Sequence, residues 1–407
     1  MDKRSFRNFN KIFLSLSFSA LCTTSFFNLT IDPFGVIDSP SIAGINAIKP
    51  RTLNNSRLFK AIDVARVRPK TILLGSSRTD IGLDPFHPAL IQPAYNLGLT
   101  APNIYELRRY LEHTLIIQPE LEKVIIGLDF QMFNDLRTPQ PDFREQRLGH
   151  AGIVRSDLLD VTLSLDALSA SWKTLTRNQD PNPPGSTRVN GMMVRAPREV
   201  SLRVFFDTIS KAQRQYQDGV YKGFRSYENS LPHLKAIIET CADREIQLIL
   251  FISPAHATEW ESIYNLGLWP LFEDWKRDIA ELHPIWDFSG YNSITSEVIS
   301  PSMIYYTDSS HYTPAAGQLV LNRILTHQLE SVPTDFGRYL IPEMISFHLE
   351  AIANERSAWH EKQAELARIV SDIKRYEETR YTEEVYPLNL ATITQAQIVL
   401  EEPSTRP

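Results

Sequence analysis

From residue 71 onward, short apolar runs alternate with stretches of helical periodicity, and this alternation restricts the chain to few folds. Five runs have the length and composition of buried strands: residues 71–75, 94–98, 123–129, 246–252 and 284–288. Helical periodicity lies between them, for example over residues 103–117 and 231–243. Strands that alternate with helices form a parallel sheet with helices on both faces. We therefore predict an α/β fold with a flavodoxin-like, doubly wound parallel sheet, which binds ligands beyond the carboxyl ends of its strands.

The third and fourth predicted strands are separated by about a hundred residues. We expect a domain over residues 35–335 with an inserted segment at about 136–230. A connection this long is usually functional or an inserted subdomain. It leaves the sheet near the edge where ligands bind, so a lid or a substrate platform is one interpretation. A surface excursion is the other.

Residues 336–407 differ in character from the domain before them. Apolar residues near heptad positions predict one amphipathic helix of about 35 residues: Ile345, Leu349, Ile352, Trp359, Leu366, Val370 and Ile373. Packing on its own domain is the default expectation, and pairing with a partner or lying on a membrane are the alternatives. The last thirty residues are rich in Glu, Thr and Pro, and we predict a poorly ordered tail.

The N-terminal residues 1–34 are predicted to be a membrane anchor. Ile12–Ile31 is an uncharged run of twenty residues, preceded by four basic ones: Lys3, Arg4, Arg7 and Lys11. Twenty helical residues span about 30 Å, the thickness of the hydrocarbon core. Basic flanks stay in the cytoplasm, which places residues 35–407 outside it. A cleaved signal peptide and a buried helix are the alternatives, although Ser17-Phe18-Ser19 is a poor cleavage signature.

Composition excludes several classes of protein. The net charge of −6 argues against nucleic acid as a partner. Two cysteines, Cys22 and Cys241, exclude a disulfide framework and a cysteine-rich zinc site. No His/Asp/Glu cluster has convincing ligand spacing, so we expect neither a metal nor another cofactor.

The turn Gly75-Ser76-Ser77-Arg78 follows the first predicted strand. A glycine permits a tight turn, and a serine at this edge can point into the cleft. Such turns also bind phosphate through backbone N–H groups or cap the next helix. Arg78 could hold an anionic group of a substrate or make a structural ion pair.

The second chemical element follows the fifth strand. Asp308 and His311 are three residues apart, so a turn between them lets the carboxylate orient the imidazole, which can then deprotonate a serine. A second Asp-x-x-His, at Asp84 and His87, is expected to be a surface loop. His256 follows the fourth strand, where it either contacts substrate or is a satisfied loop histidine.

Together these blocks resemble the SGNH/GDSL hydrolase superfamily over residues 70–330. The resemblance implies that Ser77 is the nucleophile, that Asp308 and His311 complete the triad, and that the N–H groups of Ser77 and Gly98 bind the oxyanion. The chain departs from the family at Asp129, where an Asn is expected to donate to the oxyanion. A carboxylate only accepts hydrogen bonds, so Asn134 or Asn103 is the expected replacement donor, and Asp129 is grouped with Arg78 and His256 as a substrate-binding residue.

An anchor followed by Asp32-Pro33-Phe34-Gly35 also resembles a subset of this superfamily. Its members are extracytoplasmic proteins of D-alanyl-lipoteichoic acid synthesis and alginate-type O-acetylation, which work beside a membrane-bound O-acyltransferase. The resemblance implies a serine esterase or O-acyltransferase that acts on acyl esters or an envelope polysaccharide. A non-catalytic envelope protein that binds glycans or assists assembly is the second hypothesis. A phosphate- or nucleotide-binding protein that uses the turn at Gly75–Arg78 is the third.

Overall fold

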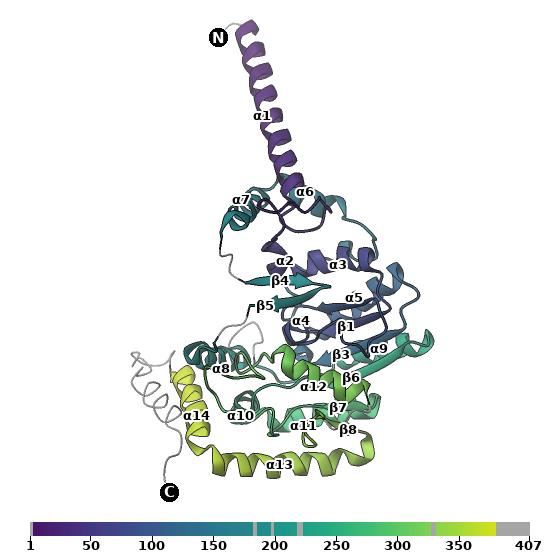
Figure 1. The fold of residues 1–407 in the computed structure, drawn as a ribbon, viewed down its shortest axis with the longest axis vertical. Coiled ribbons are helices and arrows are strands. Elements are labelled where there is room, and N and C mark those ends of the chain that lie inside the picture. Colours follow the sequence, from purple (N-terminus) through teal and green to yellow (C-terminus); the bar gives the residue numbers. More distant parts are fainter. Residues whose placement is uncertain (1–2, 182–184, 197–198, 218–222, 327–330, 380–407) are drawn as a thin grey trace.

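A computed structural model describes residues 3–181, 185–196, 199–217, 223–326 and 331–379 (Figure 1). Its centre is a six-stranded sheet with the order β2-β1-β3-β6-β7-β8. The first five of these strands are β1 (Thr71–Gly75), β2 (Ala94–Gly98), β3 (Lys123–Leu128), β6 (Gln247–Ile252) and β7 (Ile285–Asp287). All their pairings are parallel. The five predicted strands are therefore confirmed, and their order is the 2-1-3-4-5 of doubly wound sheets.

The sixth strand, β8 (Arg338–Leu340), pairs antiparallel with β7 and was not predicted. It is three residues long, too short to show a period in the sequence. It also lies beyond the predicted domain boundary at residue 335. The sheet therefore continues into the C-terminal segment.

Helices cover both faces of the sheet, as its side-chain alternation requires. Ile72 and Leu74 of β1 belong to a core with α3 (Ser56–Val67), α5 (Ile104–Ile117), α9 (Leu231–Asp243) and α11 (Trp269–Leu282). Leu73 points the other way, into a smaller core with α12 (Pro314–Leu325). This alternation follows from the two-residue period of a strand. The polar ends of the parallel strands then meet at one edge, where α4 (Ser77–Gly82) begins.

The inserted segment contains two helices, a hairpin and a third helix. They are α6 (Arg155–Leu163), α7 (Leu165–Gln179), the antiparallel pair β4 (Ser186–Val189) and β5 (Met192–Arg195), and α8 (Leu202–Gln217). Helices α6 and α7 pack against the end of α1 (Lys3–Ile31), whereas the hairpin lies against α4 (Figure 1).

The C-terminal segment is two helices rather than the single predicted one. Helix α13 (Ile345–Lys362) ends at Gln363, where the backbone leaves helical geometry, and α14 (Ala364–Thr379) turns back against α8 and α10 (Ala257–Asn265). All seven apolar residues that predicted the helix are buried. The expected packing on its own domain is therefore confirmed for residues 345–379. The predicted disordered tail, at residues 380–407, lies outside the described residues.

Helix α1 is the one described helix that is long and apolar enough to cross a membrane. This makes it a candidate anchor or signal sequence. Its last turns are built into the domain: Asn28 Nδ2 donates to the Thr162 carbonyl oxygen at 2.9 Å, and Ser171 Oγ donates to Asn28 Oδ1 at 2.7 Å. Ile31 and Asp32 are buried.

Candidate active site

Ser77 is the first residue of α4, at the carboxyl edge of the sheet. The preceding Ser76 caps this helix, because its Oγ accepts a hydrogen bond from the Arg78 N–H at 3.0 Å. Gly75 lets α4 approach the strand closely: a Cβ there would lie 2.2 Å from Thr79 Oγ1. The capping role expected as an alternative for this turn thus belongs to Ser76 and leaves the hydroxyl of Ser77 available.

Ser77, His311 and Asp308 form a continuous chain of hydrogen bonds. Ser77 Oγ lies 2.9 Å from His311 Nε2, and His311 Nδ1 lies 2.9 Å and 3.0 Å from the two Asp308 oxygens. The carboxylate only accepts hydrogen bonds, so the proton of the imidazole is placed on Nδ1. Nε2 is then the acceptor for the serine hydroxyl, which is the arrangement of a serine nucleophile with its general base.

The turn that carries Asp308 and His311 is shaped by local contacts. An antiparallel bridge joins Tyr306 to Tyr312 on either side of the turn. Asp308 Oδ1 also accepts the N–H groups of Ser310 at 2.9 Å and His311 at 2.8 Å. Burial alone would raise the pKa of Asp308, but the His311 imidazole and these donors lower it to about 2. The carboxylate is therefore ionised at neutral pH.

Two cavities meet the triad, and the inserted segment lines both. The first, of about 440 Å³, contains Ser77 and His311 and is lined by Met193 and Arg195 of the β4–β5 hairpin. The second, of about 290 Å³, contains Asp308 and His311 and is lined by residues of α8, among them Lys211. The interpretation of the insertion as a platform over the site is supported, whereas a plain surface excursion does not describe it.

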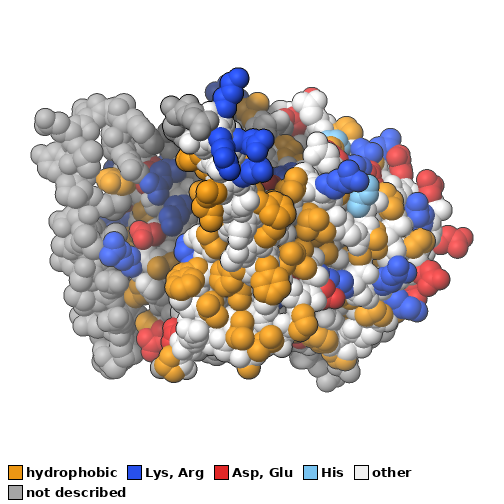
Figure 2. All heavy atoms as spheres, turned by 90° about the horizontal axis from the view of Figure 1, so that it is seen from above, with side chains coloured by type: hydrophobic (Ala, Val, Ile, Leu, Met, Phe, Trp, Pro, Cys, Tyr) orange, Lys and Arg blue, Asp and Glu red, His pale blue; other side chains and the backbone are white. Residues whose placement is uncertain are grey.

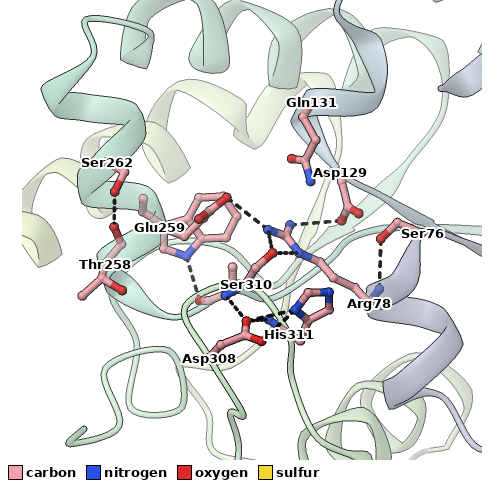
Figure 3. A network of polar contacts seen from close by, with 12 residues as sticks. Ser76, Arg78, Asp129, Gln131, Thr258, Glu259, Ser262, Asp308, Ser310 and His311 are labelled. Carbon is pink, nitrogen blue, oxygen red and sulfur yellow. Dashed lines mark hydrogen bonds and ion pairs between the residues drawn. The ribbon is translucent and has the colours of Figure 1, made fainter. Parts of the chain in front are cut away.

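Arg78 lines the first cavity next to Ser77, and its guanidinium makes the structural ion pairs that were the alternative expectation, so a role in holding a substrate anion stays a prediction. Its side chain is buried and held by three groups (Figure 3). Nη1 lies 3.2 Å from Asp129 Oδ1, Nη2 lies 3.3 Å from Glu259 Oε1, and Nη2 donates to Ser310 Oγ at 3.0 Å. We call Arg78, Asp129 and Glu259 the arginine cluster. It ties α4, the end of β3 and α10 to the turn of the triad.

Asp129 is also buried and paired, and its predicted substrate-binding role stays a prediction. It is 1% exposed and bonded to Arg78, and it lines neither cavity of the site. The carboxylate at this position is thus paired with a neighbouring cation, Arg78, which it shares with Glu259. Glu259, the second carboxylate of the cluster, was missed because it lies 181 residues from Arg78 in sequence and follows no motif.

Among the predicted oxyanion donors besides Ser77, the Gly98 N–H is engaged elsewhere, and neither Asn134 nor Asn103 lines a cavity of the site. The Gly98 N–H donates to Asn96 Oδ1 at 3.0 Å, and this glycine instead gives α4 room, because a Cβ would lie 2.5 Å from the Asp80 nitrogen. Asn134 Oδ1 accepts the Leu136 N–H at 3.1 Å, and Asn134 lines neither cavity. Asn103 caps α5 and donates to the Arg137 carbonyl oxygen at 2.9 Å.

Gln131 is the amide side chain that the structure places at the site. It follows β3 in a short 3₁₀ turn, Phe130–Phe133, and lines both cavities, as His311 does. Figure 3 shows it near Asp129. The Tyr216 hydroxyl lies 3.5 Å from Gln131 Oε1. The signal in the sequence was its closeness to Asp129, the position at which the resembled motif has an asparagine.

His256 is buried with both ring nitrogens in contact with neighbouring groups, and a contact with substrate stays a prediction. It is buried at the start of α10, with Nδ1 2.9 Å from Thr258 Oγ1 and Nε2 2.8 Å from the Glu297 carbonyl oxygen. Burial lowers its pKa to about 4, so the imidazole is neutral at physiological pH. The interpretation as a satisfied loop histidine is the one that its contacts support.

A second buried ion cluster fixes the other end of α4. Asp80 Oδ1 lies 2.7 Å from Lys60 Nζ and 2.7 Å from Arg188 Nη1 of strand β4. Lys60 also donates to the Gly98 carbonyl oxygen at 2.6 Å. Burial lowers the pKa of Lys60 to about 7. We call Asp80, Lys60 and Arg188 the aspartate cluster, which fastens the hairpin to the helix of Ser77.

The fold and the site define an α/β protein with a Ser–His–Asp chain at the carboxyl edge of its parallel sheet. Neither a protein-family model nor a curated protein matches the sequence. Among the described residues, no group of three or more His, Cys, Asp or Glu side chains is placed to hold a metal ion.

Proposed function

We propose that this protein is a membrane-anchored serine esterase or O-acyltransferase of the SGNH/GDSL type, acting on acyl esters of an envelope polysaccharide. The observation that carries the proposal is the 2.9 Å contact between Ser77 Oγ and His311 Nε2, with Asp308 on the other ring nitrogen. The doubly wound strand order supports the same class.

In the proposed mechanism, Ser77 attacks the carbonyl carbon of the acyl ester. Its hydroxyl proton passes to His311 Nε2 as the bond to carbon forms, and Asp308 stabilises the imidazolium. The proton then moves to the leaving alkoxide oxygen when the ester bond breaks, which leaves an acyl-serine. A hydroxyl of water or of a glycan attacks that acyl group, again with His311 as base, and Ser77 is regenerated.

Oxyanion stabilisation is assigned to the Ser77 N–H and the Gln131 side-chain amide. The first N–H groups of a helix have no acceptor within it, and Ser77 is the first residue of α4. Gln131 lines both cavities beside His311, whereas the Gly98 N–H is bonded to Asn96. Loss of one such donor costs about 10²–10³ in rate, so Gln131→Ala is expected to fall in this range.

The localisation part of the proposal rests on α1. We infer that α1 stays attached and spans the membrane, with residues 35–407 outside the cytoplasm, because its last turns bond to α6 and α7. Cleavage after Asn28 would remove those bonds. Two cavities that meet at His311 give room for an acyl donor and an acceptor hydroxyl. A membrane-bound O-acyltransferase is the proposed donor partner.

The test is hydrolysis of a chromogenic acetyl ester by the full-length protein in detergent. Ser77→Ala and His311→Ala are each expected to lower kcat/KM by at least about 10³-fold, because nucleophile and base act as a unit. Ser76→Ala is the matched control, since it removes a neighbouring hydroxyl that caps the helix, and it should stay within about tenfold of wild type. Equal rates in wild type, Ser77→Ala and His311→Ala would remove this site from consideration.

A further inference from the structure

Helices α6 and α7 bury small or polar side chains and expose large apolar ones, which is the reverse of a helix in water. The inner face of α7 consists of small or polar residues, Ala167, Ala170, Ser171 and Thr174, and α6 buries Asp157, Val161 and Thr162. Their large apolar side chains point outward: Leu158, Leu159, Leu163, Leu165, Leu168 and Trp172. Leu165 is 84% exposed and Trp172 is 62% exposed.

The outward residues form one continuous face rather than scattered exceptions. Leu165, Leu168 and Trp172 recur at helical spacing along one side of α7. Leu159 and Leu163 extend that side onto α6, which packs against α7. Seen from above, hydrophobic side chains gather on the face around the base of α1 (Figure 2). Exposed patches of this kind mark protein or membrane contacts.

The length of α1 that stands clear of the domain favours a membrane over a protein partner at this face. Between Thr24 and Ile31, most of its side chains are partly or fully buried, and its bonds to α6 and α7 start from Asn28. The uncharged run that stands clear of the domain is therefore Ile12–Thr23, which is about 18 Å long at 1.5 Å per residue. The hydrocarbon core is about 30 Å thick. The uncharged run that begins at Ile12 reaches that thickness only when it extends to Ile31, and its last residues lie between α6 and α7.

We propose that α6 and α7 form a collar that is inserted into the outer interface of the lipid bilayer around the end of α1. The collar is defined as residues 155–179. A span that reaches Ile31 places the collar at the boundary between headgroups and acyl chains. Trp and Leu side chains suit this depth. The acidic side chains Asp160 and Asp166 are paired with Arg144 and Arg51, so insertion does not bury unpaired carboxylates.

Membrane contact through the collar sets the position of the active site. Helix α7 leads directly to the β4–β5 hairpin, and that hairpin lines the cavity of Ser77. One inserted segment thereby joins the bilayer surface to the cleft. The collar holds the cleft at a fixed height above the bilayer, where a membrane-associated acyl donor would be presented. The proposal needs α1 to span the membrane, but it is independent of the esterase chemistry.

The experiment measures the depth of single fluorescent labels on the full-length protein in phosphatidylcholine vesicles. Cys22→Ser removes the exposed thiol, and Cys241 is buried. Cysteines are then introduced one at a time by Leu165→Cys, Trp172→Cys, Phe18→Cys and Phe347→Cys, and each is labelled with an environment-sensitive dye. Phe18 reports the span. Phe347 is 75% exposed on α13, at the opposite end of the molecule, and is the matched control.

Doxyl-labelled lipids are expected to quench the labels at residues 165 and 172 several-fold more than the label at residue 347. The quencher near the headgroup should act most strongly at 165 and 172, and the deeper one at 18. Strong quenching at 18 with none at 165 and 172 would overturn the collar and leave the anchor intact. No quenching at 18 would overturn both. A response at 165 in native membranes but not in pure lipid would assign the face to a protein partner and overturn the lipid assignment.

Discussion

Arg78 and Asp80 lie two residues apart on α4, and both are buried ions with two oppositely charged partners. The two clusters therefore have opposite charge balances. The arginine cluster has one cation between two carboxylates, Asp129 and Glu259. The aspartate cluster has one carboxylate between two cations, Lys60 and Arg188. With every group ionised, the first carries one surplus negative charge and the second one surplus positive charge.

The difference shows how one short helix serves two purposes. Burial raises the pKa of Glu259 and lowers the pKa of Lys60, so in each cluster the surplus ion is the one pushed toward neutrality. The arginine cluster lies at the turn of Asp308 and His311, because Arg78 also donates to Ser310 Oγ. The aspartate cluster reaches the hairpin, where Arg188 also donates to the carbonyl oxygens of Thr52 and Gly191. One cluster therefore holds the turn of Asp308 and His311, and the other fastens the hairpin to α4.

The largest expected effect on stability is that of Arg78→Met, which removes the cation of the arginine cluster. The substitution leaves Asp129 and Glu259 buried and facing each other without a cation, so the free energy of unfolding is expected to fall by about 3–5 kcal/mol. Chemical denaturation of the full-length protein in detergent measures the loss. Adding Asp129→Asn and Glu259→Gln to the same variant should recover part of the stability, because the unpaired charges are gone. A loss below about 1 kcal/mol would show that the carboxylates were already neutral.

Arg188→Met removes one of the two cations of the aspartate cluster and is expected to cost less, because the central carboxylate keeps a partner. Asp80 keeps Lys60 as its partner, so the loss is that of charge-assisted hydrogen bonds, about 1–3 kcal/mol. The same denaturation series measures it. The expected signature is a smaller loss than in Arg78→Met. An equal or larger loss would contradict the idea that a buried ion with one remaining partner is more stable than buried ions left with none.

The pH dependence of the free energy of unfolding tests whether Lys60 is the cation of the aspartate cluster that loses its proton first. Its folded pKa of about 7 lies below the unfolded value, so between the two values the unfolded chain binds more protons. The free energy of unfolding therefore rises with pH above about 7. Below that pH, the full cost of burying the charged Lys60 ammonium is present. From pH 7 to pH 8, wild type should gain about 1 kcal/mol relative to Lys60→Met. Thermal or chemical unfolding of both proteins at the two pH values measures the gain, and a constant difference would contradict it.

The smallest expected effect is that of Asp129→Asn on ester hydrolysis. Were Asp129 an ionised group facing the oxyanion, the amide would add a donor, which is worth about 10²–10³ in rate. Because Asp129 is buried against Arg78 instead, kcat is expected to change by less than about threefold, far below the value of an oxyanion donor. Steady-state kinetics with the chromogenic ester provides the measurement. A rise of a hundredfold would place Asp129 in the oxyanion pocket.

Position at the carboxyl edge of the sheet could be predicted from the sequence, whereas the hydrogen-bond partners of the residues at that edge could not. Ser77 and His311 were both expected at the carboxyl edge, and they lie within hydrogen-bond distance although 234 residues separate them. Gly98 and His256 were also chosen by their positions after strands, but the Gly98 N–H donates to Asn96 and both ring nitrogens of His256 contact neighbouring groups. Residue type tells what a group can do, and only its neighbours decide whether it is available.

The sequence by itself determined the five parallel strands, the helices between them and the edge at which Ser77, Asp308 and His311 meet. These features depend on short periods of apolar residues and on the common direction of the strands. The tertiary structure alone decided the pairing of Arg78 with Glu259 and of Asp80 with Arg188, the break at Gln363 and the outward leucines of the collar. Each of these depends on which surface meets a segment across a long loop. A local pattern records how apolar a residue is, and packing alone determines what lies against it.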